Sequence, residues 1–197
     1  MSDSRASEDK LGWVKPYYTR AGEYWASTGI EDVHLTRAAT VTRLCGPGAK
    51  RVLELGAGTG EAAAATADAG HSVVAIEFSP TRAPNIELLS RESRSGSLQA
   101  LEADFYTVTL DGGFDVVCYW DGFGVGADAD QRRLLRRISH EWLAPGGVAL
   151  IDIFSPFRWI REVGKIWNLD RNHFSHSLPA AGGIGELANR GRGRSGP

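Results

Sequence analysis

The residues LELGAGTG at positions 53–60 are the stretch of this chain whose types and spacing are best suited to hold a ligand. Gly56, Gly58 and Gly60 alternate directly after an apolar run, which predicts a strand that turns into a helix. Such a turn aims bare backbone and the amino terminus of a helix at a polar or anionic group. Three alternating glycines cost much conformational entropy for a turn alone, so we expect ligand contact here.

The end of this loop argues against two common nucleotide sites. A phosphate-binding P-loop ends in Gly-Lys-Ser or Gly-Lys-Thr, whereas this loop ends in Gly60-Glu61. The dinucleotide fingerprint has its third glycine one position later, where Glu61 places a negative charge. Nucleoside triphosphates and NAD are therefore disfavoured, and an NAD(P)-dependent oxidoreductase stays open as an alternative.

The spacing Glu54-x-Gly56-x-Gly58-x-Gly60 resembles motif I of the class I methyltransferases that use S-adenosyl-L-methionine. The resemblance continues through FDVVCYWDGFG and LAPGGVALIDIF and covers about residues 50–154. It implies a Rossmann-like fold, S-adenosyl-L-methionine as the cofactor, and transfer of its methyl group to a small molecule. A catalytically inactive partner subunit that binds the same cofactor is the remaining alternative.

The resemblance also implies which residues contact the cofactor. In that family the acid beside the loop and the loop backbone hold the cationic amino-acid end, a role that falls to Glu54 here. Glu77 matches the acid that accepts from both ribose hydroxyls, and Asp104 matches the acid at the adenine amino group. The residues expected at the cofactor are Glu54, Gly56, Ala57, Gly58, Gly60, Glu77, Phe78, Asp104, Phe105 and Trp120.

The acceptor side is less defined by the sequence. Aromatic residues crowd the segment before the first strand, and Tyr17, Tyr18 and Trp25 could line an acceptor pocket or pack inside an amphipathic lid. Asp121 follows the fourth strand on the side of the glycine loop, which makes it a candidate for catalysis or substrate contact, or a turn residue. In-line displacement depends mainly on positioning, so no single catalytic residue is predicted, and the acceptor atom can be oxygen, nitrogen or carbon.

Composition and charge restrict the partners. The formal net charge is -2 with 23% charged residues, so there is no basic field for nucleic acid. The polar start MSDSRASEDK and the absence of any run near 18 apolar residues predict a cytoplasmic protein without a membrane segment. Cys45 and Cys118 have no CxxC spacing, so we expect core thiols and no metal site.

The elements that position these residues alternate between strands and helices, which predicts an α/β, Rossmann-like three-layer sandwich with a mostly parallel sheet. The expected strands are 51–55, 72–78, 97–103, 114–120 and 147–154, and the expected helices are 61–69, 80–90 and 129–142, with Ser79 and Asp128 as N-caps and Pro80 at the first helical position. A parallel sheet of this kind binds ligands at the carboxyl ends of its strands.

The predicted organisation has four parts. Residues 1–10 are expected to be a disordered tail, 11–48 a helical lead-in or lid, 49–178 the cofactor-binding domain, and 179–197 a second disordered tail. An amphipathic stretch is expected at 156–169, and no strand pair is legible after residue 154, so the last strands of the family's sheet should be missing or atypical. The resulting open sheet edge predicts either a homodimer or poor solubility.

Overall fold

The computed structural model describes residues 12–22, 27, 29–153, 155, 157, 160, 161, 166–170 and 173–177. The chain divides into two compact units, residues 1–153 and 154–197, and each is described by itself below. The tails expected at 1–10 and 179–197 lie outside the described residues, and the four-part organisation stays a prediction.

The first unit is built on a five-stranded sheet with the strand order β3-β2-β1-β4-β5. All four pairings are parallel. The strands are β1 Arg51–Leu55, β2 Ser72–Glu77, β3 Ser97–Glu102, β4 Phe114–Tyr119 and β5 Leu143–Ile151. The strand order reverses at β1, which puts a crevice at the carboxyl end of this strand.

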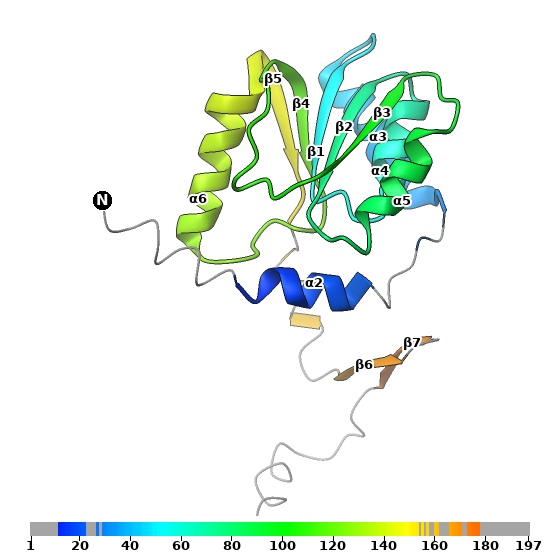
Figure 1. The fold of residues 1–197 in the computed structure, drawn as a ribbon, viewed down its shortest axis with the longest axis vertical. Coiled ribbons are helices and arrows are strands. Elements are labelled where there is room, and N and C mark those ends of the chain that lie inside the picture. Colours follow the sequence, from blue (N-terminus) through cyan, green and yellow to red (C-terminus); the bar gives the residue numbers. More distant parts are fainter. Residues whose placement is uncertain are drawn as a thin grey trace, which may run out of the picture. The chain divides into compact units, whose positions relative to one another are not determined.

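Helices cover both faces of the sheet, as Figure 1 shows, with α3, α4 and α5 on one side and α6 on the other. The described helices of this unit are α2 Val14–Gly22, α3 Asp32–Cys45, α4 Glu61–Asp68, α5 Ala83–Ser90, α6 Asp128–Arg137 and the π-helical turn η2 Ile138–Trp142. This arrangement confirms the predicted Rossmann-like three-layer fold, and α2 and α3 agree with a helical lead-in.

The alternation along β1 explains why both faces must be covered. Val52 packs with the α3, α4 and α5 side, whereas Leu53 and Leu55 pack with the α6 side. All three side chains are fully buried. Each contributes roughly 1.5–3 kcal/mol by leaving water, so exposing either face of the sheet would be costly.

The helix after β2 begins later than predicted. Pro80 was expected at its first position with Ser79 as cap, but α5 is Ala83–Ser90. The Ser79 hydroxyl lies 2.9 Å from the Thr81 hydroxyl and makes no cap. Pro84, which has a fixed φ and no N–H, occupies the first turn instead.

The helix before β5 is divided into α6, Asp128–Arg137, and η2, Ile138–Trp142. The predicted cap is wrong because Asp128 is already the first helical residue and Ala127 takes the cap position. Asp130 completes the helix start, since its carboxylate accepts a hydrogen bond of 2.8 Å from the Ala127 N–H.

The described strands of the second unit correct another expectation. Strands β6, Ile166–Asp170, and β7, His173–Ser177, form an antiparallel pair, where no strand pair was predicted. The expected amphipathic stretch at 156–169 is therefore wrong at its end. Trp167 and Leu169 alternate with Asn168, a period that also suits a strand. The described part of the chain contains no helix long and apolar enough to cross a membrane.

Candidate functional site

The glycine loop joins β1 to α4 at the carboxyl edge of the sheet. Gly56, Gly58 and Gly60 all have positive φ values, 58°, 59° and 92°, which side chains disfavour. At Gly60 space is also limiting, because a Cβ atom would lie 2.8 Å from Ile86 Cγ1. The loop conformation therefore requires the glycine spacing seen in the sequence.

Glu77, at the end of β2, holds the loop in place. Its Oε2 accepts a hydrogen bond of 2.8 Å from the Gly58 N–H, and its Oε1 accepts one of 2.8 Å from the Ser79 N–H. Burial raises the pKa of Glu77, although these two backbone donors oppose the shift. Each carboxylate oxygen has a second lone pair, so Glu77 can still accept from the hydroxyls of a ligand.

Glu54, in β1, is a buried acid with an unused oxygen. Its side chain is 2% exposed, and Oε2 has no hydrogen-bond partner among the described residues. Burial raises the pKa of Glu54 to about 8, Arg37 lowers it and Glu61 raises it further. A buried carboxylate without a partner is costly, so this position fits a cationic group such as an ammonium.

From the sequence, Glu61 served only to disfavour nucleoside triphosphates and NAD. The structure shows in addition that Glu61 is a buried acid beside the glycine loop. Its side chain is 5% exposed at the start of α4. Oε2 accepts from the Thr59 hydroxyl at 2.6 Å, and Oε1 has no partner among the described residues. Two buried acids, Glu54 and Glu61, thus flank the glycine loop. Their positions at the two ends of ELGAGTGE are the sequence feature from which this pair could have been predicted.

A second group of predicted residues meets at a cavity of about 190 Å³. Phe78 and Asp104 both line it, together with Tyr106 and with Val14 and Lys15 from α2. The complete lining is Val14, Lys15, Phe78, Glu102, Ala103, Asp104 and Tyr106. A cavity with an aromatic wall and a carboxylate suits a flat heterocycle that carries an amino group.

Phe105 and Tyr18 support this cavity from two sides. Phe105 is buried, with its ring centre 4.8 Å from that of Tyr106 and 5.5 Å from that of Tyr119. The edge of Tyr18 packs against Phe78 at a centroid distance of 6.1 Å. Burial raises the pKa of Tyr18, so its hydroxyl keeps its proton and can donate.

A third group lies at the carboxyl ends of β4 and β5. Arg37 of α3 pairs with Asp121 and lies 3.6 Å from Asp152 Oδ2. Its guanidinium carbon is 5.6 Å from the centre of the Trp120 ring. Asp121 has a φ of 57°, and its N–H donates to Asp152 Oδ1 at 2.5 Å. Arg37 and Asp152 were not predicted, since no local pattern connects them to Asp121.

The remaining predicted residues stay outside these groups. Tyr17 is half exposed and packs edge-on against Trp13 and Tyr18, at centroid distances of 5.9 Å and 5.1 Å. Trp25 lies outside the described residues. Within the described ranges, no group of three or more His, Cys, Asp or Glu side chains could hold a metal ion.

Comparison with known proteins finds methyltransferases. Residues 52–147 match the family model of a methyltransferase domain. The chain is 34% identical over 116 residues to the cypemycin N-terminal methyltransferase of a Streptomyces species, covering 58% of this chain and 46% of that protein. It spans about half the length of this curated relative.

Two solved structures have the same fold. The glycopeptide N-methyltransferase MtfA complexed with sinefungin is 26% identical with a TM-score of 0.54, covering 70% of this chain and 60% of that one. The sugar N-methyltransferase KedS8 from a Streptoalloteichus species is 25% identical with a TM-score of 0.50, covering 68% and 58%. The sheet order confirms the Rossmann-like fold, and over residues 52–147 the chain is similar to methyltransferase domains.

Proposed function

We propose that this chain binds S-adenosyl-L-methionine and transfers its methyl group to a small-molecule acceptor. The observation that carries the proposal is the buried carboxylate of Glu54, in the strand that enters the glycine loop, whose Oε2 has no hydrogen-bond partner among the described residues. This oxygen suits the ammonium of an amino acid. A dinucleotide would instead bring phosphates next to Glu61.

Each group of residues has a role in this proposal. Glu54 holds the ammonium end, the second lone pairs of Glu77 accept from the ribose hydroxyls, and Phe78 and Asp104 contact the adenine. When bound, the cofactor supplies a methyl group on a positively charged sulfur. Phe105 supports the adenine side from the core.

We further propose nitrogen as the acceptor atom, ahead of oxygen and carbon. The proposal is supported by the names of the three relatives above, all of which specify an N-terminal or N-methyltransferase, whereas the mitomycin 7-O-methyltransferase MmcR, 26% identical with a TM-score of 0.51, keeps oxygen as the second candidate. Asp121 and Asp152 lie at the carboxyl ends of β4 and β5 and can attract an amine. In this role a carboxylate orients the acceptor and takes up the proton that nitrogen loses.

Calorimetry with S-adenosylhomocysteine and with NADH tests the cofactor. We expect binding of S-adenosylhomocysteine alone, weakened at least about tenfold by Glu77→Ala because two loop contacts and the ribose acceptor are lost. Glu87→Ala, which removes an exposed carboxylate of α5, is the matched control and should leave the affinity unchanged. Binding of NADH without S-adenosylhomocysteine would instead support the oxidoreductase alternative.

An acceptor screen separates an enzyme from an inactive cofactor-binding partner. Transfer of a labelled methyl group to amino compounds is expected, and their N-acetylated forms are the matched controls. Transfer to neither set, in a chain that binds S-adenosylhomocysteine, would favour the inactive partner.

The assembly and location of the protein are also proposals. β5 and β3 are the outer strands of the five-stranded sheet, and such an edge can offer backbone groups to a second copy. A homodimer in light scattering would support this pairing. We also propose a cytoplasmic location, which fractionation can test.

A further inference from the structure

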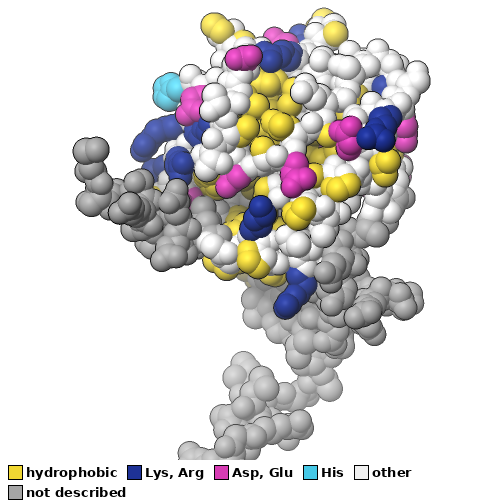
Figure 2. Space-filling view, in the orientation of Figure 1, with side chains coloured by type: hydrophobic (Ala, Val, Ile, Leu, Met, Phe, Trp, Pro, Cys, Tyr) yellow, Lys and Arg dark blue, Asp and Glu magenta, His cyan; other side chains and the backbone are white. Residues whose placement is uncertain are grey.

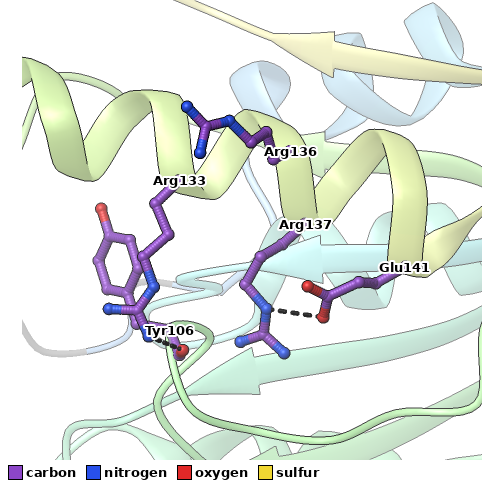
Figure 3. A pocket seen from close by; sticks show the side chains of 5 residues that line it. All are labelled: Tyr106, Arg133, Arg136, Arg137 and Glu141. Atoms are coloured by element: carbon purple, nitrogen blue, oxygen red, sulfur yellow. Dashed lines mark hydrogen bonds and ion pairs between the residues drawn. The ribbon is translucent and has the colours of Figure 1, made fainter. Parts of the chain in front are cut away.

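A larger cavity lies beside α6, away from the glycine loop. Its volume is about 380 Å³, and its lining consists of Tyr106, Arg133, Arg136, Arg137 and Glu141 (Figure 3). Four of these five side chains come from α6 and η2, and Tyr106 follows β3. The space-filling view shows that basic side chains gather over α6 (Figure 2).

The Arg137 side chain is held by several contacts within the fold. Its two terminal nitrogens donate to the carbonyl oxygens of Phe105 and Val108, both at 2.5 Å. Its Nε donates to Glu141 Oε2 at 2.9 Å, and its guanidinium carbon is 4.7 Å from the centre of the Trp142 ring. These contacts fix Arg137 as one wall of the cavity, so its charge cannot move away from its neighbours.

The side chains of Arg133 and Arg136 make fewer contacts than that of Arg137. Arg133 donates one hydrogen bond of 2.9 Å, to the carbonyl oxygen of Tyr106, and its guanidinium carbon is 5.6 Å from the Tyr106 ring centre. In the described part of the chain, the Arg136 side chain makes no hydrogen bond or ion pair, whereas its carbonyl oxygen accepts from the Ser139 hydroxyl at 3.3 Å. Most of the N–H donors of these two guanidinium groups are therefore available to a ligand.

The charges of the side chains that line the cavity do not balance. Three guanidinium groups line it, and the single carboxylate, Glu141, is already paired with Arg137. Arg133 and Arg136 are three residues apart, and Arg133 and Arg137 four apart, so like charges face one another along the helix. Since the whole chain has a formal net charge of -2, this local excess of positive charge does not follow from composition.

We propose that Arg133 and Arg136 bind an anionic group, a phosphate or a carboxylate of a small molecule, in this cavity. An arginine fork matches the oxygens of either group in two parallel hydrogen bonds. An anion would also relieve the repulsion along α6. This site is additional to the proposed cofactor site and does not depend on it, although Tyr106 lines both cavities.

Titration of the full chain with inorganic phosphate in chloride buffer, followed by calorimetry, tests the proposal. We expect one saturable site that Arg136→Gln and Arg133→Gln each weaken at least about tenfold. Arg132→Gln is the matched control, because Arg132 is an exposed arginine of the same helix outside the cavity lining. This variant should bind phosphate within about twofold of the wild type.

Further probes distinguish the source of the anion. Acetate should bind more weakly than phosphate because it carries less charge. Equal or tighter binding of phenyl phosphate would mean that the site takes the anionic end of a larger molecule, and weaker binding would mean a free ion. Arg136→Lys retains the charge without the fork and should show an intermediate loss.

Two results would overturn the proposal. One is the absence of saturable binding of phosphate, acetate and phenyl phosphate in a wild-type chain whose circular dichroism shows it folded. The other is an equal loss in Arg132→Gln and Arg136→Gln, which would show attraction to a charged surface without a defined site. S-adenosylhomocysteine binding in the same samples reports separately on the cofactor proposal.

Discussion

The carboxyl end of β1 and the carboxyl ends of β4 and β5 both present acids, but in opposite states. At β1, Glu54 is 2% exposed and has an oxygen without a partner among the described residues. At β4 and β5, the side chains of Asp121 and Asp152 are 60% and 37% exposed, and both lie beside Arg37. The acid at β1 is therefore buried and has an oxygen without a partner among the described residues, whereas the acids at β4 and β5 are more exposed and lie beside an arginine.

This difference fits two different kinds of ligand. A dry carboxylate gains a large free energy from a cation of the right shape, and the rigid loop around it accepts little variation. A hydrated ion pair exchanges partners at small cost, because each exposed contact contributes about 1 kcal/mol or less. We therefore expect an invariant ligand at β1 and an exchangeable one at β4 and β5.

The strongest test of the β1 end is Gly58→Arg. A Cβ atom there meets open space, but φ is 59° and the long side chain would fill the ligand side of the loop. We expect the affinity for S-adenosylhomocysteine in calorimetry to fall by more than about 100-fold, or roughly 3 kcal/mol. Gly70→Arg is the matched control, since Gly70 has a φ of 93° and open space at the far end of α4. An equal loss in both variants would contradict a local effect.

The pH dependence of binding tests whether Glu54 is the group that meets the ammonium. Its pKa is about 8 in the folded chain, and a bound ammonium favours the ionised form. Below pH 8 binding must release a proton, so the affinity for S-adenosylhomocysteine should fall by up to about tenfold per pH unit. Affinity should level off above pH 8, and a flat profile from pH 6 to 8 would contradict the assignment.

Glu54 should make the free energy of unfolding decrease with rising pH, whereas it makes the affinity for S-adenosylhomocysteine increase. Because burial raises the pKa of Glu54 from 4.5 in the unfolded chain to about 8, the folded state holds a proton that the unfolded state loses in this window. The free energy of unfolding should therefore decrease as pH rises from about 4.5 to about 8. Urea titrations of the wild type and Glu54→Gln should converge near pH 4 and diverge near pH 8, with the variant more stable at the higher pH.

Glu54→Gln also measures the strength of the contact itself. The amide keeps the shape but removes the charge, and a charge-assisted hydrogen bond contributes about 1.5–3 kcal/mol. At pH 8 we expect the calorimetric affinity for S-adenosylhomocysteine to fall by roughly 10-fold to 100-fold. An unchanged affinity would mean that the ammonium binds elsewhere.

Asp121→Asn should have the smallest effect on the cofactor. Its carboxylate is 60% exposed, so we expect the affinity for S-adenosylhomocysteine to stay within about twofold and the free energy of unfolding to change by less than about 1 kcal/mol. A large loss of cofactor affinity would remove the distinction between the two ends of the sheet.

The sequence predicted the fold and part of the site for local physical reasons. The apolar runs around Val52 and Val116 alternate with helix-compatible segments, and that order alone predicts a parallel sheet. The glycine spacing predicted a turn between a strand and a helix, which the structure confirms, and all three glycines have positive φ. Helix starts were less predictable, because Ser79 and Asp128 are good caps whose side chains interact elsewhere or lie one position too late.

By itself, the sequence determined the class of fold, the glycine loop and the acids at the ends of β1 and β2, because these features follow from residue type and short spacing. Only the tertiary structure decided that Glu54 is dry, that Arg37 meets Asp121 across 84 residues, and that three arginines share a cavity with Tyr106. Burial and pairing over such separations depend on how helices pack against the sheet, and no local pattern carries that information.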